Sequence, residues 1–145
     1  MSTPEPRHFP LILDTHVWIW LLNGDERLRR SRALAWIERA TRRAQVKVSV
    51  LSVWEVGMLE AKGRISLPCH PLEWVHKALG GPGISLVPLT EEIAIDSSRL
   101  PGEFHGDPVD RILVASARIL GGTLITCDRK ILDYSKHCPL HAVSL

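Results

Sequence analysis

The sequence predicts an α/β protein, a three-layer domain in which a parallel sheet lies between helices, from three observations. Short apolar runs alternate with segments of helical period along the chain, which is typical of βαβ units. The length of 145 residues favours one domain with a sizeable core. A hydrophobic share of 45% with 23% charged residues is typical of a globular protein.

The N-terminal half contains two of the expected strands. The first is an apolar run that stops abruptly at Asp14, after which the apolar pattern resumes at helical spacing. Gly63 follows the last helix of this half, a position where a left-handed residue is common. We expect strands over residues 10–13 and 46–50, and helices over 15–22, 31–44 and 53–62.

The C-terminal half contains the remaining elements. Gly80-Gly81 and Gly121-Gly122 each follow a helical segment, and residues 101–106 form the longest loop. We expect helices over residues 72–79, 91–100 and 108–120, and strands over 84–89, 122–126 and 141–145.

Residues 1–9 are expected to form a disordered lead-in before a single domain over 10–145. They lack the basic-then-apolar pattern of a signal peptide, and no apolar run reaches the roughly 18–20 residues of a membrane span. Three cysteines without paired spacing favour reduced thiols, so we expect a cytoplasmic protein. The net charge of +2 is too small to indicate a nucleic-acid binder by itself.

Four acids stand at equivalent places in the expected fold. Asp14 and Asp128 directly follow apolar runs, whereas Glu55 and Asp110 lie one turn into helices. In an open parallel sheet, the carboxyl ends of the strands and the N-termini of the next helices share one edge, where ligands bind. We therefore expect all four carboxylates at that edge.

Each acid also has a purely structural interpretation, which stays open. Glu55 matches the last position of an S-x-x-E capping box, and Asp14 and Asp128 would each cap a short helix. Asp107 precedes a proline, the pattern of a helix N-cap, so we assign it to capping. Asp110 would then interact with the helix dipole. Four acids at one edge together favour a site over four separate caps.

A cluster of carboxylates requires a cation. Two carboxylates about 4 Å apart repel each other by about 1 kcal/mol in water and about 4 kcal/mol at a partly screened site, so one of them would otherwise take up a proton. An oxygen-only set without histidine at ligand spacing favours Mg²⁺ or Mn²⁺ over Zn²⁺. Such an ion activates a water and holds a phosphodiester for in-line attack. The pattern therefore predicts metal-dependent phosphodiester hydrolysis.

The segments LILDTHVWIW, SVWEVGMLEAKGRI, GDPVDRILVASA and LITCDRKI together resemble the PIN-domain nucleases, most closely the VapC-type toxins of bacterial toxin–antitoxin pairs. The resemblance spans nearly the whole chain from Pro10 onward. It implies a Rossmann-like, five-stranded PIN-like sheet in the order 3-2-1-4-5 and Mg²⁺- or Mn²⁺-dependent cleavage of RNA. It also implies a homodimer and a cognate antitoxin that inhibits the enzyme.

The resemblance also implies a role for each acid. Asp14, Glu55, Asp110 and Asp128 match the family's four acids in order. Asp14 and Asp110 are implied to touch the metal most directly, and Asp128 completes the metal site. Glu55 is implied to orient a metal-bound water or to act as the base. The family often has phenylalanine where Val109 stands, an apolar exchange.

Other residues have less specific interpretations. The arginines between positions 27 and 43 either follow an RNA backbone or form a solvated helix face, and we favour the face. Arg111 is expected either to contact a phosphate or to pair with Asp107, and His16 is expected to be a packing residue. The five tryptophans are expected in the core or a dimer interface. Hydroxyls that are candidates to hydrogen-bond the carboxylates are those of Thr15, Ser49 and Thr126.

Four other functions compete with this interpretation. A phosphatase of the haloacid-dehalogenase type needs an acid where His16 stands, and a response-regulator receiver needs an acidic pair at the first strand and an aspartate after the third, so both are disfavoured. A non-catalytic RNA- or protein-binding module of the same fold stays open. So does a metal-dependent DNase, because the same acids would serve either nucleic acid.

Overall fold

In a computed structural model that describes residues 4–145, five parallel strands form one sheet. The strand order is β3-β2-β1-β4-β5, and every neighbouring pair is parallel. This confirms the α/β class and the expected order 3-2-1-4-5. The strands are β1 (Leu11–Leu13), β2 (Val46–Ser49), β3 (Ile84–Val87), β4 (Thr123–Ile125) and β5 (His141–Val143).

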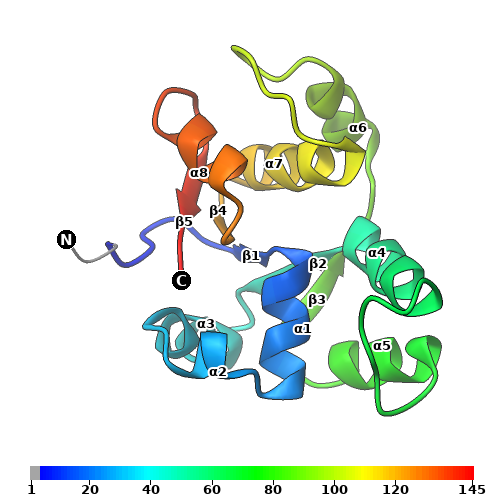
Figure 1. Cartoon of the computed structure of the whole chain (residues 1–145). Helices are drawn as coiled ribbons and strands as arrows, with labels where there is room; N and C mark the ends of the chain where they lie inside the picture. Colours follow the sequence, from blue (N-terminus) through cyan, green and yellow to red (C-terminus); the bar gives the residue numbers. More distant parts are fainter. Residues whose placement is uncertain (1–3) are drawn as a thin grey trace.

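Within the described residues, eight helices connect and cover these strands. In Figure 1, helices α6, α7 and α8 lie on one side of the sheet, and α1, α2, α3 and α5 lie on the other. No helix in this part of the chain has the length and apolar character needed to cross a membrane. The helices are α1 (Thr15–Asn23), α2 (Glu26–Arg29), α3 (Ala33–Arg42), α4 (Val50–Ala61), α5 (Pro71–Leu79), α6 (Glu91–Ser98), α7 (Pro108–Leu120) and α8 (Arg129–Ser135).

Three helices differ from the expected boundaries. Helix α4 begins at Val50, directly after β2, because the side chain of Ser49 accepts a hydrogen bond from the Leu51 N–H and caps it. Helices α2 and α8 were absent from the expected set because each is too short to show a repeated apolar face. Each begins after an aspartate whose side chain caps it, Asp25 for α2 and Asp128 for α8.

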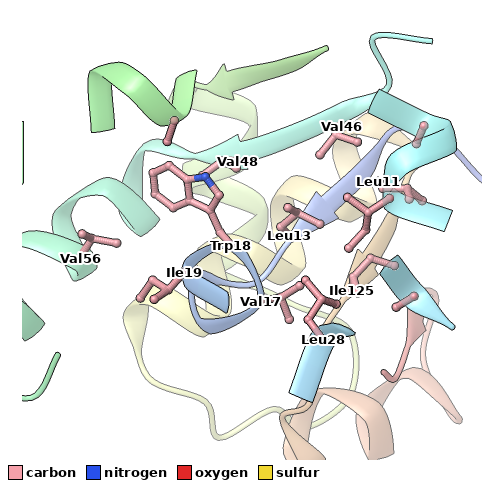
Figure 2. Close-up of a cluster of buried hydrophobic side chains, with 14 of the residues drawn as sticks. Leu11, Leu13, Val17, Trp18, Ile19, Leu28, Val46, Val48, Val56 and Ile125 are labelled. Atoms are coloured by element: carbon pink, nitrogen blue, oxygen red, sulfur yellow. The ribbon is translucent and has the colours of Figure 1, made fainter. Parts of the chain in front are cut away.

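The core divides at the sheet because successive residues of a strand point to opposite faces. Leu11 and Leu13 of β1 pack in a cluster with residues of α1, α3, α4 and α5, whereas Ile12 packs in the cluster formed with α6, α7 and α8. Figure 2 shows the first cluster, in which Trp18 lies among side chains from several elements. The central strands β1 and β4 are buried along their whole length, which fixes the positions of the residues that follow them.

Most of the tryptophans are in the core, as expected. Trp18, Trp36 and Trp74 are buried, and the rings of Trp18 and Trp74 meet edge to face with centroids 4.9 Å apart. Trp20 is partly buried against the same cluster. Trp54 is 57% exposed on α4 and makes no part of the core.

The expected lead-in falls partly on residues 1–3, which lie outside the described part of the chain. Residues 4–9 contact the domain, which differs from the expected disorder. Pro6 is buried, the Thr123 hydroxyl donates to the His8 carbonyl at 2.7 Å, and Glu5 forms an ion pair with Arg39. These partners lie on β4 and α3, far along the sequence, so the composition of the segment alone does not reveal them.

Candidate active site

A cavity of about 310 Å³ opens where β1 and β4 end. Its walls come from the residues that follow these strands and from α1, α4 and α7. Five of its lining side chains are carboxylic acids, and they include all four acids singled out in the sequence. The lining residues are Asp14, His16, Val17, Trp20, Glu55, Asp107, Asp110, Cys127 and Asp128.

Asp14 is positioned by the two central strands. Its backbone N–H donates to the Ile125 carbonyl at 3.0 Å, which continues the β1–β4 pairing by one residue. The Thr126 hydroxyl donates to one carboxylate oxygen at 2.5 Å, and the Thr15 N–H donates to the other at 2.7 Å. Burial raises the pKa of Asp14, and these two hydrogen bonds oppose the rise. The carboxylate is therefore held in one orientation but at an electrostatic cost.

Two acids come from the start of α7. Asp107 accepts a hydrogen bond from the Asp110 N–H at 2.9 Å, which confirms the capping role expected for Asp107 beside Pro108. Asp110 follows in the first turn of the helix. Burial, followed by the charges of Asp107, Asp128 and Asp14, raises the pKa of Asp110 to about 7. Without a cation, this carboxyl keeps its proton to a much higher pH than an ordinary aspartate does.

Glu55 lies in the second turn of α4, because Ser49 caps this helix and Val50 begins it. The capping-box interpretation of Glu55 is therefore wrong: Ser52 lies inside the helix and accepts a hydrogen bond from the Thr15 hydroxyl at 2.8 Å. Burial raises the pKa of Glu55, and the negative charge of Asp14 adds to that rise. The side chain thus faces the cavity as a stronger base than a free glutamate.

Asp128 both caps helix α8 and lines the cavity. One of its carboxylate oxygens, Oδ1, accepts from the Lys130 N–H at 2.8 Å and from the Ile131 N–H at 3.2 Å, and so caps α8. Its other oxygen, Oδ2, makes no hydrogen bond within the described residues. Capping and a place on the cavity wall are therefore compatible for the same side chain.

Four cavity residues were not singled out as site residues, namely His16, Val17, Trp20 and Cys127. His16, expected to be a packing residue, is instead exposed and lines the cavity, with its ring centroid 6.2 Å from that of Trp20. Trp20 and Cys127 also line it. Trp20 follows His16 by four residues and Val17 by three, so helical spacing could have indicated that these three side chains lie close together on α1.

Arg111 does not pair with Asp107. Its Nε donates to the Ser97 carbonyl at 2.8 Å, and its Nη1 donates to the Phe104 carbonyl at 2.6 Å. The guanidinium therefore hydrogen-bonds the end of α6 and the loop before α7. It fixes the segment next to Asp110 and leaves the acids uncompensated.

The donor set of the cavity fits a hard divalent cation. No lysine or arginine is among its lining residues, and His16 is the one basic side chain there against five acids. The described residues contain no preassembled group of three or more ligands around one point. Mg²⁺ typically binds one or two carboxylates directly and keeps several waters, which the cavity has room to hold. The residues present therefore suit Mg²⁺ or Mn²⁺ held partly through water.

A family model and a curated relative both place this chain among the PIN-domain proteins. The PIN domain family model matches residues 11–137. Ribonuclease VapC22 of Mycobacterium tuberculosis is 31% identical over 130 residues, which cover 90% of this chain and 95% of that protein.

Two solved structures share the fold. VapBC2 from Rickettsia felis, bound to a DNA fragment from its promoter, matches with a TM-score of 0.65 at 12% identity, over 92% of this chain and 97% of that chain. DNA-bound VapBC from Salmonella typhimurium matches with a TM-score of 0.65 at 16% identity, over 92% of this chain and 96% of that chain. At these identities the similarity concerns the fold alone.

Proposed function

This chain belongs to the PIN-domain family, and we propose that it is a metal-dependent endoribonuclease that acts as the toxin of a toxin–antitoxin pair. The observation that carries the proposal is the cavity that gathers five acids without a lysine or arginine on its walls and in which the pKa of Asp110 is about 7. Similarity to ribonuclease VapC22 over 90% of the chain supports RNA as the substrate.

Asp14 and Asp110 would hold Mg²⁺ or Mn²⁺ directly, and Asp128 would complete the site. When bound, such an ion lowers the pKa of a water and neutralises charge on the phosphodiester. Thr126 and the Thr15 N–H keep the Asp14 carboxylate in one orientation, which is the usual role of groups that hydrogen-bond a metal ligand. The acids therefore act mainly by positioning.

Glu55 is proposed to orient the attacking water or to take its proton. A general base works best when its pKa approaches the working pH, and burial raises the pKa of Glu55 in that direction. The water oxygen then bonds to phosphorus in line with the leaving oxygen while the water proton passes to Glu55. The P–O bond to the leaving oxygen breaks, and that oxygen takes up a proton from solvent.

The first test is cleavage of total cellular RNA by the purified protein. We expect discrete fragments with Mg²⁺ or Mn²⁺, none with EDTA, and none from Asp110→Asn. Glu92→Gln is the matched control, because Glu92 is an exposed acid on α6 outside the cavity, and it should cleave like the wild type. Cleavage that persists in EDTA or in Asp110→Asn would contradict the proposal.

The same assay separates the two competing functions. Equal cleavage of matched single-stranded DNA would favour a DNase, since the two substrates differ at the 2′-hydroxyl. Binding of RNA without cleavage, at any metal tested, would favour a binding module. In that case Asp14, Asp110 and Asp128 would act as helix caps or dipole partners only. Glu55, in the second turn of α4, would have no such role.

Two partners belong to the proposal, a cognate antitoxin protein and a second copy of this chain. We expect co-expression with the protein encoded beside this one to suppress cleavage and to yield a stable complex. Light scattering of the purified chain should give twice its monomer mass. A monomer at micromolar concentration would contradict the homodimer.

A further inference from the structure

An arginine stands beside the acidic cavity, held by side chains on two sides. The guanidinium carbon of Arg27 lies 4.3 Å from the ring centroid of Trp20, which lines the cavity. Asp25 accepts from Nε of Arg27 at 2.9 Å and from Nη2 at 2.8 Å. The Arg27 backbone N–H also donates to Asp25, at 2.8 Å. A bidentate pair and a stacked ring together give this guanidinium a defined position.

One edge of the Arg27 guanidinium remains available. The group carries five N–H donors in a planar fork, and Asp25 uses Nε–H and one N–H of Nη2. No hydrogen bond joins Nη1 to any of the described residues. The edge formed by Nη1 and the second N–H of Nη2 matches two oxygens of a phosphate. The side chain is 65% exposed, so a ligand can reach it.

The neighbouring arginines lack this arrangement. Arg29 and Arg30 both pair with Glu26 in exposed contacts on α2, and neither lines the cavity or stacks on a residue that does. Arg27 also influences a second wall residue: burial raises the pKa of Cys127, and the charge of Arg27 opposes that rise. Among the arginines between positions 27 and 43, Arg27 is thus the one that the structure connects to the cavity walls.

We propose that Arg27 binds a phosphate of the RNA next to the one that is cleaved, and so positions the strand over the acids. This inference rests on the proposed ribonuclease function. A metal at the acids would compensate the reacting phosphate, but the neighbouring phosphate would still approach five carboxylates. A cation held beforehand by Trp20 and Asp25 offsets that repulsion and loses little side-chain entropy on binding.

The test compares Arg27→Gln with Arg30→Gln, a matched loss of one positive charge on the same short helix. Binding of a fluorescent single-stranded RNA is measured by anisotropy at several salt concentrations, with each change made in the Asp110→Asn background. We expect Arg27→Gln to weaken binding about tenfold and to reduce the slope of log K against log salt by about 0.7, the loss of one phosphate contact. Arg30→Gln should stay within about twofold.

Cleavage kinetics with Asp110 restored give a second readout. Arg27→Gln should raise KM about tenfold and change kcat by less than about threefold, because the contact exists before and during the reaction. Arg27→Lys should recover the salt dependence but only part of the affinity, since an ammonium cannot form the bidentate contact. A structural role alone would not produce this separation, and circular dichroism of the three variants checks that they fold.

Three outcomes would overturn the assignment or separate it from the function itself. Equal weakening by Arg27→Gln and Arg30→Gln would overturn it, because diffuse positive charge would then explain the binding. Unchanged KM and affinity in Arg27→Gln, in a protein whose cleavage needs Asp110, would overturn it while the ribonuclease function stands. RNA binding that depends on Arg27 in a protein that cleaves nothing would support the contact and overturn the ribonuclease function.

Discussion

The interior of the sheet and its carboxyl edge are built by the same strands but differ in the kind of side chain they bury, which is apolar in the interior and acidic at the edge. Along β1 and β4 every side chain is buried, and Trp18 Nε1 is the one buried side-chain polar atom among the described residues without a hydrogen-bond partner. At the edge, burial and mutual repulsion raise the pKa values of Asp14, Glu55 and Asp110. The interior stabilises the domain, whereas the edge gathers acids whose charged forms are disfavoured there in the absence of a cation.

Asp14→Asn should produce the largest effect and should act on activity alone. Asparagine keeps an oxygen that can accept the Thr15 N–H, but it removes a carboxylate that we propose to bind the metal, so we expect cleavage to fall by at least about 10⁴-fold. The free energy of unfolding without metal should stay equal or increase, because a buried carboxylate with a raised pKa is gone. RNA cleavage and urea denaturation check the two halves. A loss of stability above about 2 kcal/mol with activity retained would reverse the comparison.

Trp18→Ala should produce the next largest effect and should act on stability. Trp18 is fully buried between β1, α4 and α5, so its truncation leaves a cavity and should cost about 3–5 kcal/mol in the free energy of unfolding. Trp54→Ala is the control, because Trp54 is mostly exposed, and it should change stability by about 0.5 kcal/mol or less. Trp18→Phe offers a milder variant if the alanine variant does not fold. Equal losses at both tryptophans would show that the core is not where the stability lies.

The pH dependence of metal-free stability should show the smallest effect. The pKa of Asp110 rises from an ordinary 3.8 to about 7 on folding, so the folded state binds this proton more tightly than the unfolded chain does. Its contribution to stability is therefore present below about pH 4 and is lost as the pH rises toward 7. Relative to Asp110→Asn, the wild type should lose a few degrees of Tm over that window, as measured by calorimetry in EDTA.

Adding Mg²⁺ sharpens the same measurement. At pH 7 the ion should raise the Tm of the wild type and of Glu92→Gln, because it binds the folded state and compensates the acids. It should raise the Tm of Asp110→Asn much less. A Tm of the wild type that does not respond to Mg²⁺ or Mn²⁺ would argue that the acids do not form a metal site.

Much of the fold could be predicted because its signals are local or topological. The alternation of apolar runs and helical segments indicated the sheet, and the position of Asp14 and Asp128 at the ends of apolar runs indicated the edge at which they lie. The start of α4 could not be predicted, since Ser49 and Ser52 both match an N-cap. The strand pairing decides it: Ser49 still pairs with Val87 in the sheet, so the helix begins at the next residue.

The partners of side chains were less predictable than the positions of the acids. Arg111 donates to two backbone carbonyls, and a carbonyl leaves no trace in the sequence because every residue has one. Similarly, the exposure of His16 depends on how α1 turns against the sheet. The Trp20–Arg27 contact depends on the short helix α2, whose four residues are too few to show a periodic pattern.

The two hydrogen bonds of Arg111 have a consequence for which substitutions this protein can accept during evolution. Arg111 donates to the carbonyl oxygens of residue 97 at the end of α6 and of residue 104 in the loop. Any amino acid supplies a carbonyl oxygen, so a substitution at either position does not remove the acceptor. The number of residues in the loop is constrained, because a longer or shorter loop would move the carbonyl of residue 104 away from the guanidinium. Gly106 is a further exception, since an added Cβ would lie 2.4 Å from Cε1 of the buried Phe104 ring and 3.0 Å from the Cβ of Asp110. Substitutions in this loop should therefore be tolerated at its exposed positions, whereas the loop length, the buried ring of Phe104 and the two glycines at positions 102 and 106 should be constrained.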